Sequence, residues 1–262
     1  MRPTVLRRAA FTATSVAALA LLATACGGSS GGTDKGGDGK TAQAGKTATA
    51  APARALSAAE LEKAALTQAD VKSGKLTTKV PARDDVAQDK VKADDAVCAP
   101  LAHLQAGTYV GKPSATVKRS WVGDAKKPAA GAGAEGAVMA GLDRAKVLET
   151  LAAYPDGGAE QAMKDLEAAA QKCAGGFTYT VTGTRNEFVK VTTTQAPGGA
   201  DDALALTLTM DAGEVKAPVK AVVVRKGATL AYFPAINLFS AATGKDFGFP
   251  AELVQAQLVK LG

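Results

Sequence analysis

The sequence predicts an α+β domain, with an antiparallel sheet of about five to seven strands and helices packed mainly on one face. Three observations predict it. Order begins sharply at "LSAAEL", after a stretch that lacks large apolar residues. Apolar residues then recur at helical spacing as far as Cys173, and from Phe177 onward they alternate with polar residues at a period of two. A run of helices followed by a run of strands is typical of α+β folds.

Residues 1–25 are predicted to be a secretory signal peptide. The opening "MRPTVLRR" is short and basic, and the apolar stretch "AAFTATSVAALALLATA" carries no charge. This stretch is shorter than the roughly 20 residues that a membrane-spanning helix needs. A true N-terminal anchor helix is the alternative. The pair Arg7-Arg8 followed by Phe11 leaves open twin-arginine export as well as general secretion.

Cys26 follows the small residues Ala23-Thr24-Ala25 and precedes a Gly/Ser stretch. This arrangement is similar to the lipobox of bacterial lipoproteins, in which the cysteine thiol takes a diacylglyceryl group and becomes the mature N-terminus. Ala23 stands where the lipobox usually has leucine, and Leu22 precedes it. We therefore expect acylated Cys26 to hold the protein on the lipid bilayer, at the extracytoplasmic face of the cell membrane.

Residues 26–55 are predicted to be a disordered, Gly/Ala/Ser-rich tether. Between Gly27 and Arg54 the chain has no Leu, Ile, Val, Phe, Tyr, Trp or Met, so nothing it buries offsets the entropy cost of ordering. Of the formal charge of +6, residues 1–25 contribute +3 and residues 26–55 contribute +2. The remaining part, 56–262, is close to neutral and lacks the basic patch that nucleic-acid binding requires. Nucleic acid is therefore excluded as a partner.

Residues 56–262 are predicted to form a single α+β sensor-like domain, long enough to bury a core without a metal. Its first helix begins at Ser57, which forms a capping box with Glu60, and runs to about Thr67. A second helix is expected near 95–105, with Pro100 in its first turn, where a missing N–H is tolerated.

The middle of the domain is predicted to alternate between strands and helices. "ATVKRSWVG" and "GAVMAGLD" are expected to be strands, separated by the loop "DAKKPAAGAGAEG". Within that loop "GAGAEG" matches the dinucleotide fingerprint, but the strand before it and the helix after it are not predicted. Asp143 is expected to cap a helix that carries Val147 and Leu151, and a further helix over about 159–172 turns Cys173 toward the core.

The last part of the chain is predicted to be strand-rich. Short runs with a period of two are separated by turn residues, as in antiparallel hairpins and meanders. The runs are "FTYTVTGT", "EFVKVTTT", "ALALTLTM", "VKAVVVRK" and "TLAYF". "FPAELVQAQLVKL" then closes the chain as a short amphipathic helix.

Two cysteines remain once Cys26 is set aside. In an exported domain an even pair predicts a disulfide, here between Cys98 and Cys173. Closing a loop of about 76 residues would stabilise the fold by roughly 4 kcal/mol on the chain-entropy model. Two buried free thiols are the alternative. Either way we interpret these cysteines as structural.

No residue is assigned a catalytic role, and neither a metal site nor a cofactor is expected. His103 is the only histidine, and no cysteine cluster has the spacing of zinc ligands. The acidic pairs, Asp84-Asp85, Asp94-Asp95 and Asp201-Asp202, are interpreted as solvated loops. Arg119 and Trp121 are the candidates to line a ligand-binding cleft, because an aromatic side chain at a strand edge suits that role.

Four motifs occur in order along the domain: "LEKAALTQADV", "DDAVCAPLAHL", "RSWVG" and "LEAAAQKC". With the strand-rich end, they make the chain similar to the PknH-like extracellular sensor domain family, found in actinobacterial membrane kinases and in free lipoproteins. The resemblance implies a sheet with helices, disulfide bonds and a cleft for a ligand. This chain has one possible disulfide where the kinase domain has two, and no kinase domain is expected. The family's ligand is not fixed, so no binding residue is carried over.

The sequence thus favours a membrane-anchored, extracytoplasmic ligand-binding or sensor module without catalysis. The expected partners are the lipid bilayer, through acylated Cys26, and an unknown small molecule or envelope protein. The first alternative is an envelope protein–protein interaction module, which would show an exposed apolar patch. The second is a carboxylate-dependent hydrolase, which needs two carboxylates facing each other across a pocket.

Overall fold

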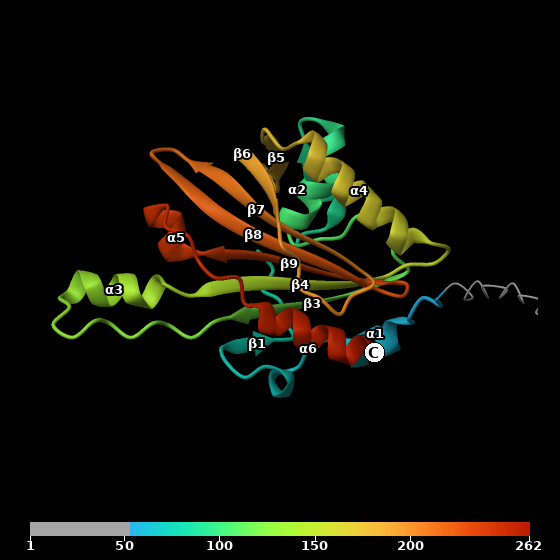
Figure 1. Cartoon of the computed structure of the whole chain (residues 1–262), viewed down its shortest axis with the longest axis horizontal. Coiled ribbons are helices and arrows are strands. Elements are labelled where there is room, and N and C mark those ends of the chain that lie inside the picture. Colours follow the sequence, from blue (N-terminus) through green and yellow to red (C-terminus); the bar gives the residue numbers. More distant parts are fainter. Residues whose placement is uncertain (1–52) are drawn as a thin grey trace, which may run out of the picture. The chain divides into compact units, whose positions relative to one another are not determined.

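The computed structural model describes residues 53–262. The predicted signal peptide, the predicted lipidation of Cys26 and most of the predicted tether lie outside these residues. In residues 53–262 one antiparallel sheet has nine strands in the order β1-β3-β4-β9-β8-β7-β6-β5-β2 (Figure 1). The strands are β1 (Lys75–Thr77), β2 (Val91–Ala93), β3 (Ala115–Val122), β4 (Ala145–Ala153), β5 (Phe177–Val181), β6 (Thr184–Thr194), β7 (Asp202–Ala212), β8 (Val215–Lys226) and β9 (Thr229–Asn237).

The expectation of five to seven strands is wrong, because the sheet has nine. The two edge strands, β1 and β2, are only three residues long. Runs this short carry no recognisable alternating pattern. They form because each pairs with a longer strand distant in the sequence, β1 with β3 and β2 with β5. Short edge strands also limit unwanted pairing between sheets of different molecules.

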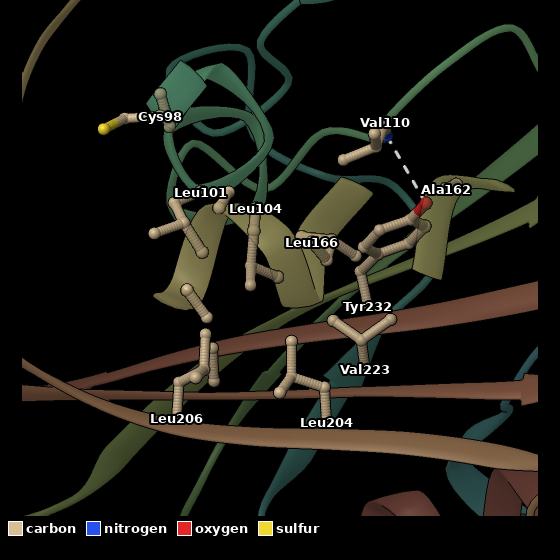
Figure 2. Close-up of a cluster of buried hydrophobic side chains, with 14 of the residues drawn as sticks. Cys98, Leu101, Leu104, Val110, Ala162, Leu166, Leu204, Leu206, Val223 and Tyr232 are labelled. Carbon is tan, nitrogen blue, oxygen red and sulfur yellow. Dashed lines mark hydrogen bonds between the residues drawn. The ribbon is translucent and has the colours of Figure 1, made fainter. Parts of the chain in front are cut away.

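Helices cover both faces of the sheet rather than mainly one. The helices are α1 (Ala58–Ala64), α2 (Ala99–Gln105), α3 (Ala134–Leu142), α4 (Gly158–Lys172), α5 (Leu238–Thr243) and α6 (Ala251–Leu261). One core lies under α2 and α4, and Figure 2 shows part of it, with Leu101 and Leu166 above Leu206 of β7. A second core lies under α1 and α6 and includes Leu61 and Phe233. Both faces of the sheet are apolar, so both require a covering layer.

The prediction of a helix after Asp143 is wrong, because this segment is the strand β4. Val147 and Leu151 lie in the core under α1 and α6, whereas Ala152 lies in the core under α2 and α4. A strand that is buried on both faces is apolar nearly throughout and shows no alternation. Its apolar residues therefore matched the spacing of a helix.

The prediction of a strand at "GAVMAGLD" is also wrong, because this segment is the helix α3. It is rich in alanine, which favours helices, and Val138 is its only β-branched residue. A helix therefore does follow the glycines of "GAGAEG", but β3 ends at Val122, well before them. Figure 1 shows residues 123–144, which we call the arm, projecting past the end of the sheet with α3 near its tip.

Three local predictions are confirmed. The Ser57 backbone N–H donates to the Glu60 carboxylate at 2.9 Å and the Glu60 N–H donates to Ser57 Oγ at 3.4 Å, which completes the capping box. Pro100 lies in the first turn of α2. Cys98, just before α2, and Cys173, just after α4, form the disulfide, which joins the two helices of one layer.

Residues 78–90, which we call the strap, connect opposite edges of the sheet. The strap leaves the edge strand β1 and enters the edge strand β2. It is held to the sheet by ion pairs, of which Lys118 Nζ to Asp85 Oδ1 measures 3.0 Å. Gln88 Nε2 anchors its far end by donating to the Tyr109 carbonyl at 3.0 Å. The strap therefore crosses the side of the sheet that carries α2.

Candidate functional site

A cleft of about 230 Å³ lies where the strap, the end of α2 and the sheet meet. Pockets for drug-sized ligands measure roughly 300–1,000 Å³, so this cleft suits a molecule smaller than those. Its wall comes from the neighbouring strands β4 and β9 and from β5, which is separated from β9 by three strands in the sheet order. Strands this far apart line one cleft because the sheet curls around α2. The lining residues are Arg83, Asp84, Val86, Gln105, Ala106, Lys146, Leu148, Tyr179, Val181, Thr182, Pro234 and Ile236.

Gln105, the last residue of α2, places an unpartnered amide at this cleft. Its Nε2 is buried and has no hydrogen-bond partner among residues 53–262. The chain then turns sharply at Gly107, whose φ of +67° is left-handed and where a Cβ would lie 2.7 Å from Leu148 Cδ1. This close approach brings the end of α2 against the wall of the cleft. A buried N–H without an acceptor is costly, so a ligand oxygen here would gain a partner that the protein lacks.

A charged pair lines the same cleft, with one partner from the strap and one from the sheet. Lys146 Nζ of β4 lies 2.6 Å from Asp84 Oδ2, and these side chains are 26% and 14% exposed. Arg83 extends into solvent at the rim, with its Nε 4.0 Å from Asp84 Oδ2. Two cations therefore share one carboxylate at the mouth of the cleft.

The floor of the cleft is apolar and includes one aromatic ring. Tyr179 of β5 stacks on Phe188, with ring centroids 6.1 Å apart. Burial raises the pKa of the Tyr179 phenol to about 12. The phenol is therefore neutral near pH 7 and offers a neutral hydroxyl beside an apolar surface. An apolar floor with a few convergent polar groups is the usual composition of a small-molecule site.

Larger cavities, of about 450 to 640 Å³, open elsewhere on residues 53–262. None of the buried polar atoms that lack a partner lies in their linings. The smaller cleft is therefore the better candidate, because it combines enclosure with an unmet hydrogen bond.

Arg119 and Trp121, the two candidates from the sequence, lie outside this cleft. Arg119 is buried and donates to the Leu66 carbonyl at 2.9 Å and to Glu62 Oε1 at 2.6 Å, which attaches the segment around α1 to β3. Trp121 is buried, and its Nε1 donates to the Ser73 carbonyl at 2.8 Å. The two residues line two different cavities on the opposite face of the sheet, so the fold does not bring them together.

Five of the six aspartates in the acidic pairs are engaged by basic residues, and the sixth, Asp95, accepts a hydrogen bond from the Val97 backbone N–H. Asp85 pairs with Lys118, Asp94 with Arg185, and both Asp201 and Asp202 with Arg225. Asp84 also pairs with a lysine of the sheet rather than standing in a solvated loop. The spacing of these residues along the chain did not indicate any of these partners.

One cavity, of about 610 Å³, does hold several carboxylates, including those of Asp124, Asp143 and Asp246. The ammonium of Lys126, 2.6 Å away, lowers the pKa of the Asp143 carboxyl. Lys220 pairs with Asp246 at 3.0 Å. A general acid needs a raised pKa, whereas Asp143 has a lowered one and Asp246 is paired with a lysine, so this cavity does not favour the hydrolase alternative.

The residues that sequence reasoning missed are Gln105, Lys146 and the role of Asp84. In the sequence, Gln105 is only the polar last residue of the helix predicted near 95–105. Lys146 falls in the helix predicted after Asp143, whereas the structure has the strand β4 there. The signal that could have found Lys146 is its place beside the apolar residues of β4; nothing comparable in the sequence marks Gln105 or Asp84.

The sequence matches no protein-family model and no curated protein. The crystal structure of the extracellular domain of PknH from Mycobacterium tuberculosis is similar, with 12% identity and a TM-score of 0.45, over 79% of this chain and 95% of that chain. An X-ray structure of a putative uncharacterized protein, an Rv0999 ortholog from Mycobacterium smegmatis, has 13% identity and a TM-score of 0.29, over 71% of this chain and 80% of that one. Similarity of this degree carries over neither a ligand nor an activity.

Proposed function

We propose that this protein is a lipid-anchored, extracytoplasmic ligand-binding or sensor module that takes a small molecule into the cleft and catalyses no reaction. The anchor rests on Cys26 and the signal-like residues before it. Among residues 53–262 no helix is long and apolar enough to span a membrane. The observation that carries the ligand-binding part is the buried Gln105 amide without a partner, in a cleft that combines an apolar floor with a few charged groups.

Native mass spectrometry of the full chain, purified from its own envelope, tests the ligand-binding part. We expect a reproducible bound small molecule, and Gln105→Leu is expected to lose it because the ligand loses its donor. The same variant is expected to gain about 1 kcal/mol in free energy of unfolding, since an unpaired buried amide is removed. Gln171→Leu, on the exposed side of α4, is the matched control and is expected to keep the molecule. Equal retention in both variants would place the molecule elsewhere.

Fractionation of cells that express Cys26→Ser tests the anchor. We expect the variant to move from the membrane fraction to the soluble fraction, because the acylated thiol is the only membrane attachment that we propose. Retention of Cys26→Ser on membranes after a high-salt wash would show that the signal-like segment remains as an anchor helix.

A second candidate function is docking to an envelope protein, and the arm is the observation that favours it. No residue of α3 is buried, although the helix is apolar. Val138 is 62% exposed and Leu238, on the adjacent α5, is 53% exposed. Ala53 lies beside Gly227 in the β8–β9 turn, at the end of the sheet opposite the arm. The arm thus faces away from the end where the predicted tether enters, toward a protein partner with an apolar surface.

The mass spectrometry experiment also separates the two functions. A protein that co-purifies with the full chain, is lost with Val138→Asp and is retained with Val259→Asp would favour docking through the arm. Val259 is the matched control because it is also a strongly exposed valine on a helix, at 82%. Self-association of the purified chain would instead identify a second copy as the occupant.

A further inference from the structure

We propose that the cleft takes a small organic anion with an apolar body, and that the acidic group of this anion displaces the Asp84 carboxylate from Lys146 and so removes one of the attachments of the strap to the sheet. The inference rests on the proposed ligand-binding function and names the chemistry of the ligand and the consequence of binding.

The polar lining of the cleft favours an anion. The donors that cannot accept are the Lys146 ammonium and the Arg83 guanidinium, the Gln105 amide N–H lacks a partner, and the one carboxylate is that of Asp84; the hydroxyls of Tyr179 and Thr182 donate or accept. If Asp84 moves away, the cleft is lined by two cations, Lys146 and Arg83, and by the buried Gln105 amide, with no carboxylate among its lining residues. A carboxylate, with two oxygens and several lone pairs, satisfies such a set of donors.

The Asp84 carboxylate shows that the position beside Lys146 accommodates an anionic group. Its carboxylate lies 2.6 Å from Lys146 Nζ, and both side chains are largely shielded from solvent. A neutral ligand that displaced Asp84 would leave Lys146 desolvated without a counter-charge, which is costly. A cationic ligand would meet Lys146 and Arg83 as like charges. An anion exchanges one ion pair for another and buries its apolar body against Leu148 and Tyr179.

Displacement of Asp84 from Lys146 would weaken the attachment of the strap to the sheet. The backbone N–H groups of Asp84 and Asp85 both donate to the Pro81 carbonyl, at 2.8 and 3.1 Å, so the two carboxylates belong to one turn. One carboxylate pairs with Lys146 of β4 and the other with Lys118 of β3. Loss of the first pair leaves this turn held through Lys118, which binds both Asp85 and the Val86 carbonyl. Binding of the anion would therefore loosen the strap at Asp84 while Lys118 and Gln88 continue to hold it.

Binding of simple probes to the full-length Cys26→Ser chain, followed by NMR, tests this inference. The probes are benzoate and hexanoate as anions, benzamide as a neutral analogue and benzylamine as a cation. We expect the two carboxylates to shift the signals of Gln105 and Tyr179 and those of the strap. Lys146→Gln is expected to weaken benzoate binding at least roughly tenfold, in line with the loss of a charge-assisted hydrogen bond.

Two strap variants test the displacement itself. Asp84→Asn is expected to bind benzoate roughly tenfold more tightly, because Lys146 no longer has a competing carboxylate. Asp85→Asn is the matched control: it loosens the same turn at Lys118 but leaves the Lys146 pair intact, and it is expected to bind as the parent does. Weaker binding by Asp84→Asn, or equal tightening in both variants, would overturn the displacement.

The remaining outcomes distinguish a failure of the preference for anions from a failure of the assignment of the ligand to this cleft. If benzamide and benzylamine bind in the cleft as tightly as benzoate, the cleft is a ligand site but its preference for anions is wrong. If no probe shifts the signals of Gln105 or Tyr179, while a different molecule is retained on the chain purified from its envelope, the assignment of the ligand to this cleft is wrong as well.

Discussion

Glu149→Gln is expected to raise the free energy of unfolding at pH 9 by on the order of 4 kcal/mol, because it removes a carboxyl that resists ionisation in the folded protein. Glu149 is fully buried in β4, and neither of its oxygens has a hydrogen-bond partner among residues 53–262. Burial raises its pKa from 4.5 to about 8. Arg119, its cross-strand partner, and Lys260 oppose this shift, whereas Asp70 adds to it.

The direction of the pH dependence follows from this raised pKa. Well below pH 4.5 the carboxyl is protonated in both the folded and the unfolded chain, so it gives stability no dependence on pH there. Between pH 4.5 and about 8 the unfolded chain releases the proton while the folded chain keeps it. The contribution of Glu149 to stability is therefore lost at up to about 1.4 kcal/mol per pH unit, until the folded protein also ionises near pH 8.

Urea denaturation of the parent and of Glu149→Gln at a series of pH values from 4 to 9 measures this effect. The two stability curves are expected to diverge progressively above pH 4.5, with the variant the more stable. Glu167→Gln, at an exposed position of α4, is the control and is expected to follow the parent. Parallel curves for the parent and Glu149→Gln would show that the carboxyl finds a partner or solvent in the folded state.

Replacing both Cys98 and Cys173 with serine is expected to lower the free energy of unfolding by about 4 kcal/mol. The disulfide closes a loop of 75 residues and links the ends of α2 and α4. Without it, the unfolded chain regains the entropy that the crosslink removes. Thermal and urea unfolding of the double variant, in a Cys26→Ser background that excludes the third thiol, measures the loss.

The reductant provides the control for the disulfide. Reduction of the Cys26→Ser parent is expected to reproduce the loss of stability, whereas the double serine variant is expected to be insensitive to reductant. If the oxidised and reduced parents unfold at the same urea concentration, the two cysteines are free thiols and their packing alone accounts for their burial. A destabilised α2 would also loosen the wall of the cleft, because Gln105 ends that helix.

Much of the local structure was predictable from the sequence because neighbouring residues alone determine it. The capping box of Ser57 and Glu60 needs only a turn of chain, and the hairpin strands β5 to β9 follow one another directly. The disulfide followed from the number of cysteines left after Cys26. The period-two pattern of the last strands survived because β6, for example, has an exposed side.

The errors have a common cause, which is burial on both faces of the sheet. The sequence of β4 shows no alternation of apolar and polar residues, because α1 and α6 cover one face of the sheet and α2 and α4 cover the other. The helix α3 has no core to face, so its apolar residues showed no helical stripe. The short strands β1 and β2 exist through pairing with strands remote in the sequence, which no local pattern records.

The sequence by itself therefore determined the capping box of the first helix and the pairing of the cysteines, which depend on composition or on residues close together in the chain; the signal peptide, the lipidation and the tether remain predictions from the sequence. Only the tertiary structure decided where a ligand would bind. The cleft draws Asp84 from the strap, Gln105 from α2, Lys146 from β4 and Tyr179 from β5. These residues meet because a curled sheet and a strap between its two edges bring them together, and such contacts leave no periodic trace in a sequence.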